Sequence, residues 1–223
     1  MSDEDVVAGI DEAGRGALAG PVVAAACVLI EPLVKMRSSI PRWRPRDRAH
    51  AHCIVTDSKL LDPQAREIAY AWIVERCVWG VGACSAAEID ALGILGATNR
   101  AMSLAVDMLA KHRVPTSLLV DGRDKFRFAF PHRSIVRGDS IEPCIAAASV
   151  IAKVTRDRLL VDLEKSHPLF SFAKHKGYGT DVHLRELKTN GPTPEHRAKF
   201  IRNALGLHEE APSLFTLSDA SEG

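Results

Sequence analysis

Two apolar segments near the start of the chain, joined by an acidic and glycine-rich turn, constrain the fold more than any other feature. The segments 6–10 and 22–30 both have the length and composition of buried β-strands. Because only a short turn separates them, they are expected to pair as a hairpin. Strand-like and helix-like segments follow in a mixed order. The sequence therefore predicts a single α/β domain with one mixed sheet flanked by helices.

The later elements are marked by start signals and by apolar spacing. Asp62 and Pro63 suit the N-cap and the first helical position, so a helix is expected from there to about Val78. Further strands are expected at 81–84, 117–120 and 134–136, and further helices at 142–166 and after a glycine-containing loop at 175–180. The segment 31–52 lacks apolar periodicity and is interpreted as a surface insertion. A long helix over 86–112 is indicated by apolar residues near helical spacing, namely Ile89, Leu92, Leu95, Met102, Val106 and Leu109.

Two patterns imitate sites of other protein classes. Gly14, Gly16 and Gly20 resemble a dinucleotide-binding turn, but a strand rather than a helix follows them, and the acids just before them would repel a pyrophosphate. These glycines instead favour a tight turn whose backbone can approach a nucleic-acid strand closely. The phenylalanines of the segment 125–130 alternate with basic residues, as in some single-strand-binding surfaces. A half-buried strand with the phenylalanines inward is the simpler interpretation.

Four carboxylates follow predicted strands. Asp11 and Glu12 end the first strand, Asp121 ends another, and Asp139 comes just after a third. Strand ends converge at one edge of a sheet, and convergent carboxylates repel one another unless a cation lies among them. Oxygen ligands of this kind suit Mg²⁺ or Mn²⁺. Any one of these acids alone is better explained as a surface residue at a turn, and adjacent strand residues such as Asp11 and Glu12 point to opposite faces unless the strand breaks there.

Composition limits the partners and the compartment. The formal net charge of the 223 residues is only +1, so charge alone does not indicate nucleic acid. No apolar stretch is long enough to span a bilayer, which predicts no membrane association. The five cysteines are scattered and odd in number, which argues against a disulfide framework or a structural zinc site. We therefore expect a cytoplasmic protein.

A series of motifs in one order closely resembles bacterial ribonuclease H type 2, also called ribonuclease HII. The resemblance covers the chain from about Gly9 to Phe200. Each motif could arise by chance, but their ordered occurrence is specific. The matching segments are 9–16 (GIDEAGRG), 18–23 (LAGPVV), 57–59 (DSK), 121–122 (DG), 138–140 (GDS), 145–153 (IAAASVIAK), 156–157 (RD), 175–180 (HKGYGT) and 196–197 (HR).

The resemblance implies a ribonuclease-H-like α/β fold with a small C-terminal helical extension. It implies an endonuclease that hydrolyses the RNA strand of RNA–DNA hybrids and cuts 5′ of single ribonucleotides in duplex DNA. Two Mg²⁺ or Mn²⁺ ions are expected, with 3′-hydroxyl and 5′-phosphate products. Asp11, Glu12, Asp121 and Asp139 would be the catalytic metal ligands. The substrate would be bound by Gly14, Arg15 and Gly16 at the ribose 2′-OH, by Lys59 at a phosphate, and by Tyr178 at the RNA-to-DNA junction.

The catalytic domain is expected to span 1–207 as a monomer, with a flexible tail at 208–223. The short segment before Asp11 favours type 2 over type 3, whose members carry an additional N-terminal domain. Arg123, Leu60 and Gly93 depart from the usual residues of the family. The alternatives are another two-metal nuclease of the same fold group and a catalytically silent hybrid-binding module. The histidines at 167, 175, 183 and 196 show no zinc-ligand spacing and carry no interpretation.

Overall fold

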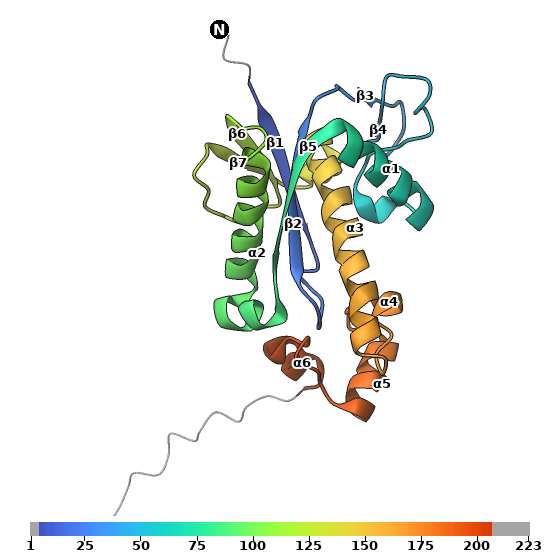
Figure 1. The fold of residues 1–223 in the computed structure, drawn as a ribbon, viewed down its shortest axis with the longest axis vertical. Helices are drawn as coiled ribbons and strands as arrows, with labels where there is room; N and C mark the ends of the chain where they lie inside the picture. The colour runs from blue at the N-terminus through green and yellow to red at the C-terminus, as the bar shows by residue number, and fades with distance from the viewer. Residues whose placement is uncertain (1–4, 207–223) are drawn as a thin grey trace, which may run out of the picture.

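A five-stranded mixed sheet forms the centre of the computed structural model, which describes residues 5–206 (Figure 1). The tail expected at 208–223 lies outside the described residues. The strand order is β5-β2-β1-β6-β7. The strands are β1 (Val7–Ala13), β2 (Val22–Leu29), β5 (Cys77–Cys84), β6 (Ser117–Asp121) and β7 (His132–Ile135), and a separate two-stranded hairpin consists of β3 (Val34–Lys35) and β4 (Trp43–Arg44).

The expected hairpin at the start of the chain is present. β1 pairs with β2 in antiparallel register, from Gly9 opposite Cys27 to Ala13 opposite Val23. On its other side β1 pairs with β6 in parallel register, which ends at Ile10 opposite Val120. β1 itself continues to Ala13. The strand break that would have turned Asp11 and Glu12 to the same face is therefore absent, because pairing with β2 keeps this segment extended.

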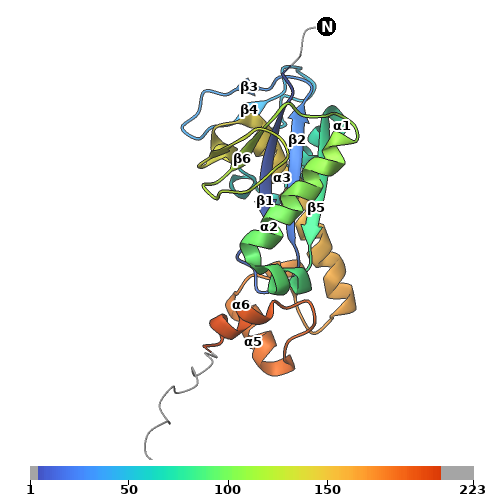
Figure 2. The same ribbon diagram turned by 90° about the vertical axis from the view of Figure 1, so that its left-hand side faces the viewer.

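Helices cover both faces of the sheet (Figures 1 and 2). On one face α2 (Ala86–Ala110) packs against β5 and β2, and on the other α3 (Pro143–Ser166) packs against β1 and β2, with α1 (Pro63–Arg76) alongside it. Small residues make this close packing possible. A Cβ added at Gly80 or Gly82 would overlap the backbone of α2. On α3, the alanines at 146–148 are fully buried against the sheet. The predicted mixed α/β fold is thereby confirmed.

Local capping explains where two helices begin. The side chain of Asp62 accepts a hydrogen bond from the backbone N–H of Ala65 at 2.8 Å, and Pro63 follows at the first helical position, as predicted. Ser85 and Glu88 form a reciprocal capping box at the start of α2. Such caps satisfy backbone N–H groups that have no partner within the helix.

Three local predictions were wrong in part. Gly93 adopts φ 71° and interrupts α2. The residues before and after this kink therefore do not share one buried helix face, and Leu92 and Leu95 are each 50% exposed. The segment 125–130 is not a strand, although Phe126 is buried in the core as expected. The insertion 31–52 is not wholly at the surface, because Trp43 is buried against the core beneath α1 and α3.

A small helical extension completes the described chain. It comprises α4 (Phe172–His175), α5 (Asp181–Asn190) and α6 (Ala198–Ala204) at the far end of α3 (Figure 1). Phe170 and Phe172 stack with ring centroids 5.3 Å apart and form a third buried cluster with Leu18 and Ala19 of the glycine-rich turn. The extension is therefore packed directly against the turn that follows β1. Within residues 5–206, no helix is both long and apolar enough to cross a bilayer.

Candidate active site

Two of the predicted carboxylates lie side by side because their strands are parallel neighbours. Asp11 follows Ile10 on β1 and Asp121 follows Val120 on β6, and Ile10 and Val120 are register partners. Both acids therefore reach the same edge of the sheet. Asp11 is 6% exposed, and its Oδ1 accepts a hydrogen bond from the backbone N–H of Glu12 at 2.7 Å.

Asp139 reaches the same place from a short 3₁₀ turn, η2 (Gly138–Ser140), between β7 and α3. The residue before this turn, Arg137, has a left-handed backbone with φ 57°. Asp121 Oδ1 accepts a 2.6 Å hydrogen bond from the backbone N–H of Gly138. This bond fixes the position of the turn, and thereby of Asp139, relative to β6.

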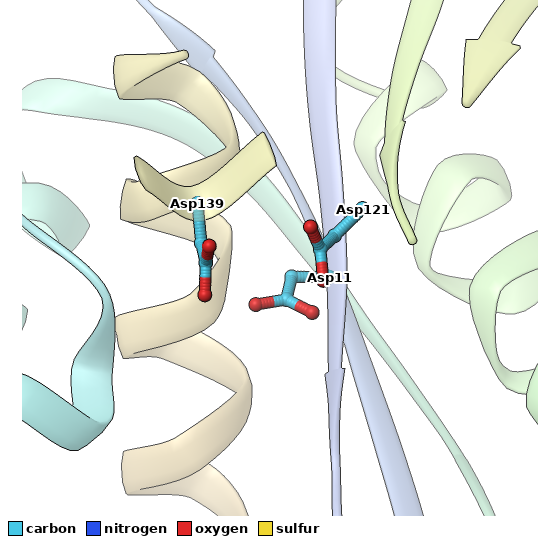
Figure 3. Close-up of side chains that lie close together, drawn as sticks. All are labelled: Asp11, Asp121 and Asp139. Carbon is cyan, nitrogen blue, oxygen red and sulfur yellow. The ribbon is translucent and has the colours of Figure 1, made fainter. Parts of the chain in front are cut away.

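The three aspartates converge (Figure 3). One carboxylate oxygen each from Asp11, Asp121 and Asp139 lies within 4.8 Å of the other two. Burial, together with the charges of Glu12 and Asp121, raises the pKa of Asp11 well above its ordinary value. Burial and the charges of Asp57 and Asp121 raise the pKa of Asp139 to about 6. Burial and mutual repulsion both oppose the charged forms of these carboxylates, and a cation among them would relieve that repulsion.

Glu12 lies beside this group, outside the set of three oxygens that meet within 4.8 Å. Its Oε1 accepts a 3.2 Å hydrogen bond from Arg15, and its Oε2 is buried without a hydrogen-bond partner. Burial raises the pKa of Glu12, and Arg15 opposes that shift. A buried, unpartnered carboxylate oxygen next to three converging carboxylates fits a divalent cation, because such a cation would satisfy it.

A cleft of about 440 Å³ adjoins the carboxylates. All five residues predicted to bind substrate line it, together with Glu12. Tyr178 is 37% exposed there. The predicted substrate residues therefore meet in one place, although they come from the turn after β1, from the 3₁₀ turn η1 (Ser58–Leu60) and from the loop after α4. The five are Gly14, Arg15, Gly16, Lys59 and Tyr178, and Ala13, Ser58, Ser149 and Lys153 complete the lining.

Two buried arginines hold the glycine-rich turn in place. The Arg156 guanidinium donates to the carbonyls of Ala19, Pro21 and Lys176, and the Arg197 guanidinium donates to those of Gly20 and Arg15. Both arginines are fully buried. Their hydrogen bonds run to backbone oxygens that would otherwise lack partners, so they fix the turn in one conformation.

Sequence reasoning did not single out several of these residues. The sequence marked Arg156 and Arg197 only as members of matching motifs, because it does not show that their side chains are fully buried. Asp124 forms a 2.8 Å ion pair with Arg15 and was not anticipated. Among the departures from the family, Arg123 is exposed, Leu60 is 44% exposed, and Gly93 forms the kink in α2.

Comparisons with known proteins agree with this arrangement. The Ribonuclease HII family model matches residues 8–204. Ribonuclease HII of Halorhodospira halophila is 45% identical over 204 residues, which are 90% of this chain and 95% of the relative. In the PCNA–RNase HII complex from Archaeoglobus fulgidus, the matching chain is 24% identical with a TM-score of 0.64, covering 87% and 94% of the two chains. Bst-RNase HIII in complex with Mn²⁺ is 17% identical with a TM-score of 0.58, covering 91% and 70%.

The mixed sheet, with acids at the ends of its parallel strands and a cleft beside them, defines a ribonuclease-H-like nuclease. The chain belongs to the ribonuclease HII family. It is accordingly a ribonuclease H, a phosphodiester hydrolase with activity on RNA–DNA hybrids.

Proposed function

We propose that this ribonuclease H cuts 5′ of single ribonucleotides embedded in duplex DNA as well as within the RNA strand of hybrids. The observation that carries the proposal is the cleft that joins Glu12, beside the aspartates, to the Gly14–Arg15–Gly16 turn and to Tyr178. A substrate strand in this cleft would contact residues able to read its sugars while a phosphodiester lies near the acids. Hydrolysis and recognition of the sugar would then act on the same strand.

Asp11, Glu12, Asp121 and Asp139 would hold Mg²⁺ or Mn²⁺. The oxygen-only donor set and the unpartnered Oε2 of Glu12 support this assignment. When bound, two such ions supply activation of a water and stabilisation of the departing oxygen of the phosphodiester. The carboxylates would contribute the negative charge that retains the ions.

The turn at residues 14–16 would distinguish RNA from DNA. Only RNA carries a 2′-OH, so a site that discriminates must contact it. Gly16 is exposed and a Cβ added there would meet nothing within 4 Å, so its backbone is open to a ligand. The Arg15 side chain is held by Glu12 and Asp124, which leaves its backbone amide as the group to reach the hydroxyl. Tyr178 would pack against the adjoining deoxyribose.

Lys59 would bind a phosphate of the substrate strand. Although burial opposes the charge, Asp57 and the acids at 11, 139 and 121 raise the pKa of Lys59 and keep it cationic. Its ammonium lies at the same cleft as Tyr178. A cation there would neutralise one phosphate and set the register of the strand.

Mapping the products of a DNA duplex with one ribonucleotide tests the proposal. Attack by water on the phosphodiester 5′ of the ribonucleotide leaves a 3′-hydroxyl and a 5′-phosphate. Attack by the 2′-OH itself would cut on the other side and leave a cyclic phosphate. We expect the first pair of ends in Mg²⁺ or Mn²⁺ and no cut in excess EDTA. A cyclic phosphate, or no cut despite cleavage of long hybrids, would overturn the proposed cleavage at single ribonucleotides.

We further infer that the protein acts as a monomer in the cytoplasm. All five cysteines lie in the described part of the chain and none forms a disulfide there, which supports a reducing compartment. Light scattering during size-exclusion chromatography tests the monomer, since a dimer would double the expected mass.

A further inference from the structure

Three histidines form a buried array beneath the loop that carries Tyr178. His175 ends α4, His183 lies on α5, and His196 lies just before α6, with exposures of 5%, 0% and 5%. The rings of His175 and His183 stack with centroids 4.1 Å apart and an interplanar angle of 12°. Phe170 and Phe172 surround them. No part of the proposed reaction uses these histidines.

Backbone groups determine where each proton of the array lies. His183 Nδ1 is 2.9 Å from the carbonyl oxygen of Tyr178, which only accepts, so Nδ1 carries the proton. His183 Nε2 is then an acceptor, and it lies 2.9 Å from His196 Nε2, which must donate. His196 Nδ1 in turn accepts from the backbone N–H of Thr193 at 3.0 Å. A single pair of neutral tautomers satisfies all these contacts.

The third histidine is fixed in the same way. His175 Nδ1 accepts from the backbone N–H of Gly177 at 3.1 Å, so its proton lies on Nε2, 3.0 Å from Glu186. Every ring nitrogen of the array is therefore engaged. An added proton on any of the three rings would place N–H against N–H and break a hydrogen bond to the loop or to the segment 193–196.

The groups that face the array also favour its neutral form. Burial lowers the pKa of His175 although Glu186 and Glu164 oppose it, and burial and His175 lower the pKa of His183. Burial, with the neighbouring His183 and His167, lowers the pKa of His196 to about 4. The charged and titratable neighbours are Glu164 on α3, His167 at its end, and Glu186 on α5.

The loop above the array is joined to the glycine-rich turn. The carbonyl of Gly177 accepts from the backbone N–H groups of Leu18 at 2.8 Å and Ala19 at 3.2 Å, and the N–H of Arg197 donates to the carbonyl of Leu18 at 2.8 Å. A Cβ added at Gly177 would overlap the carbonyl of Ala19. The array therefore supports both sides of the sugar-reading part of the cleft, but it contacts none of the four carboxylates through a described hydrogen bond.

We propose that His183 and His196 are positioning residues that hold the backbone of Tyr178 in place for contact with the RNA-to-DNA junction, and that they do so only while neutral. This inference rests on the proposed contact between Tyr178 and the substrate. The histidine array would thus determine the preference for a junction over a continuous hybrid, whereas the carboxylates would carry out hydrolysis. Because both substrates share the carboxylates, the ratio of their cleavage rates isolates the contribution of the array.

Kinetics on two substrates test the proposal. For each variant, kcat/KM is measured on a duplex with one ribonucleotide and on a continuous hybrid, and the ratio of the two is compared. His183→Leu is expected to lower the ratio by roughly tenfold, because the buried carbonyl of Tyr178 loses its hydrogen-bond donor. His183→Asn should be milder, because its side-chain amide can still donate to Tyr178. His112 is an exposed histidine in the turn after α2, and His112→Leu is the matched control that should leave the ratio unchanged.

Repeating the His183→Leu measurement in a protein that already carries Tyr178→Ala separates this inference from the proposed function. If His183 acts through Tyr178, His183→Leu should change the ratio little once Tyr178→Ala is present. An unchanged ratio in His183→Leu, with a reduced ratio in Tyr178→Ala, would overturn the positioning role alone. An unchanged ratio in Tyr178→Ala would overturn the substrate contact and this inference with it.

Nitrogen-15 NMR of the wild-type imidazoles provides a test that does not depend on a folded variant. At pH 6.5 we expect His183 to be neutral with its proton on Nδ1, and His196 and His175 to be neutral with theirs on Nε2. On acidification, the ratio of junction to hybrid cleavage should fall as these rings gain protons. A charged ring at pH 6.5, the opposite tautomer, or a ratio that stays constant through protonation would contradict the proposal.

Discussion

The backbone N–H of Gly138 donates a 2.6 Å hydrogen bond to Oδ1 of Asp121. A carboxylate that is expected to hold a metal therefore also fixes the turn that presents Asp139. A Cβ added at Gly138 would lie 2.5 Å from Ile145 Cδ1 and 3.3 Å from that same Oδ1. This hydrogen bond helps to place Asp139 relative to Asp121. A substitution at Asp121 keeps the bond if the new side chain retains an acceptor oxygen, and breaks it otherwise.

Asp121→Asn should nearly abolish turnover while preserving the fold. The amide keeps an Oδ1 that can accept from Gly138, but it removes a charge expected to hold a divalent ion. Since metal ions supply several kcal/mol of charge stabilisation, we expect turnover to fall by roughly a thousandfold or more. Without metal, the variant should be as stable as wild type or slightly more so, because repulsion with Asp11 is relieved.

The check is turnover in Mg²⁺ together with thermal unfolding in EDTA. The exposed Asp107→Asn on α2 serves as control and should leave both unchanged. Full activity in Asp121→Asn would refute the metal-ligand assignment. A large loss of thermal stability would show that the acids stabilise the fold rather than strain it.

Gly14→Ala and Gly16→Ala form a matched pair in one turn. Gly14 has φ 93° and a Cβ there would overlap the side chain of Arg156, whereas Gly16 has open space around it. Gly14→Ala should therefore lower the free energy of unfolding by about 1–2 kcal/mol or more. Gly16→Ala should leave that free energy nearly unchanged yet reduce cleavage, because its methyl group would occupy the space of the substrate sugar. Normal cleavage by Gly16→Ala would argue against the 2′-OH contact.

Tyr178→Ala should reduce cleavage at a lone ribonucleotide by about tenfold, in line with about 1–3 kcal/mol for an aromatic stacking contact. Tyr178→Phe should be milder because it keeps the ring, which lies 5.3 Å from the Arg156 guanidinium. Tyr70→Ala on α1, which removes an aromatic ring outside the cleft, is the control and should leave cleavage at the lone ribonucleotide nearly unchanged. Equal activity of Tyr178→Ala and wild type on this substrate would exclude the predicted contact.

The buried histidines should contribute a loss of stability as the solution is acidified from about pH 6.5 toward pH 4, whereas the raised pKa values of Asp11 and Asp139 act in the opposite direction. The pKa of His196 is lowered from 6.5 to about 4, so on acidification the unfolded chain takes up this proton first and is thereby stabilised relative to the folded state. The difference between these two pKa values corresponds to about 3 kcal/mol at most. His175 and His183, whose pKa values are also lowered, act in the same direction.

Denaturant unfolding between pH 7 and pH 4 measures this dependence. His196→Gln should flatten it, whatever its stability at neutral pH, because the titrating group is gone. The carboxylates titrate in both proteins, so their contribution cancels in the difference. Parallel curves for the variant and wild type would show that His196 takes up its proton equally in the folded and unfolded chains.

The sequence predicted correctly those element boundaries that depend on neighbouring residues. Asp62 and Pro63 marked the start of α1, and Asp121 marked the end of β6, because capping and strand ends depend on neighbouring residues. The prediction failed where a single backbone angle mattered. Gly93 breaks the phase of α2, and only its φ of 71° reveals that Leu92 turns toward solvent.

The sequence by itself determined the mixed α/β class, the opening hairpin, the family, and the identity of the candidate carboxylates. These follow from apolar spacing and from residue types in a fixed order, which are properties of the chain. Only the tertiary structure decided that Asp11 meets Asp121 and Asp139 while Glu12 lies to the side, because strand pairing across more than 100 residues sets which faces coincide. It alone also buried Arg156, Arg197 and three histidines, since burial is created by elements that are distant in sequence and close in space.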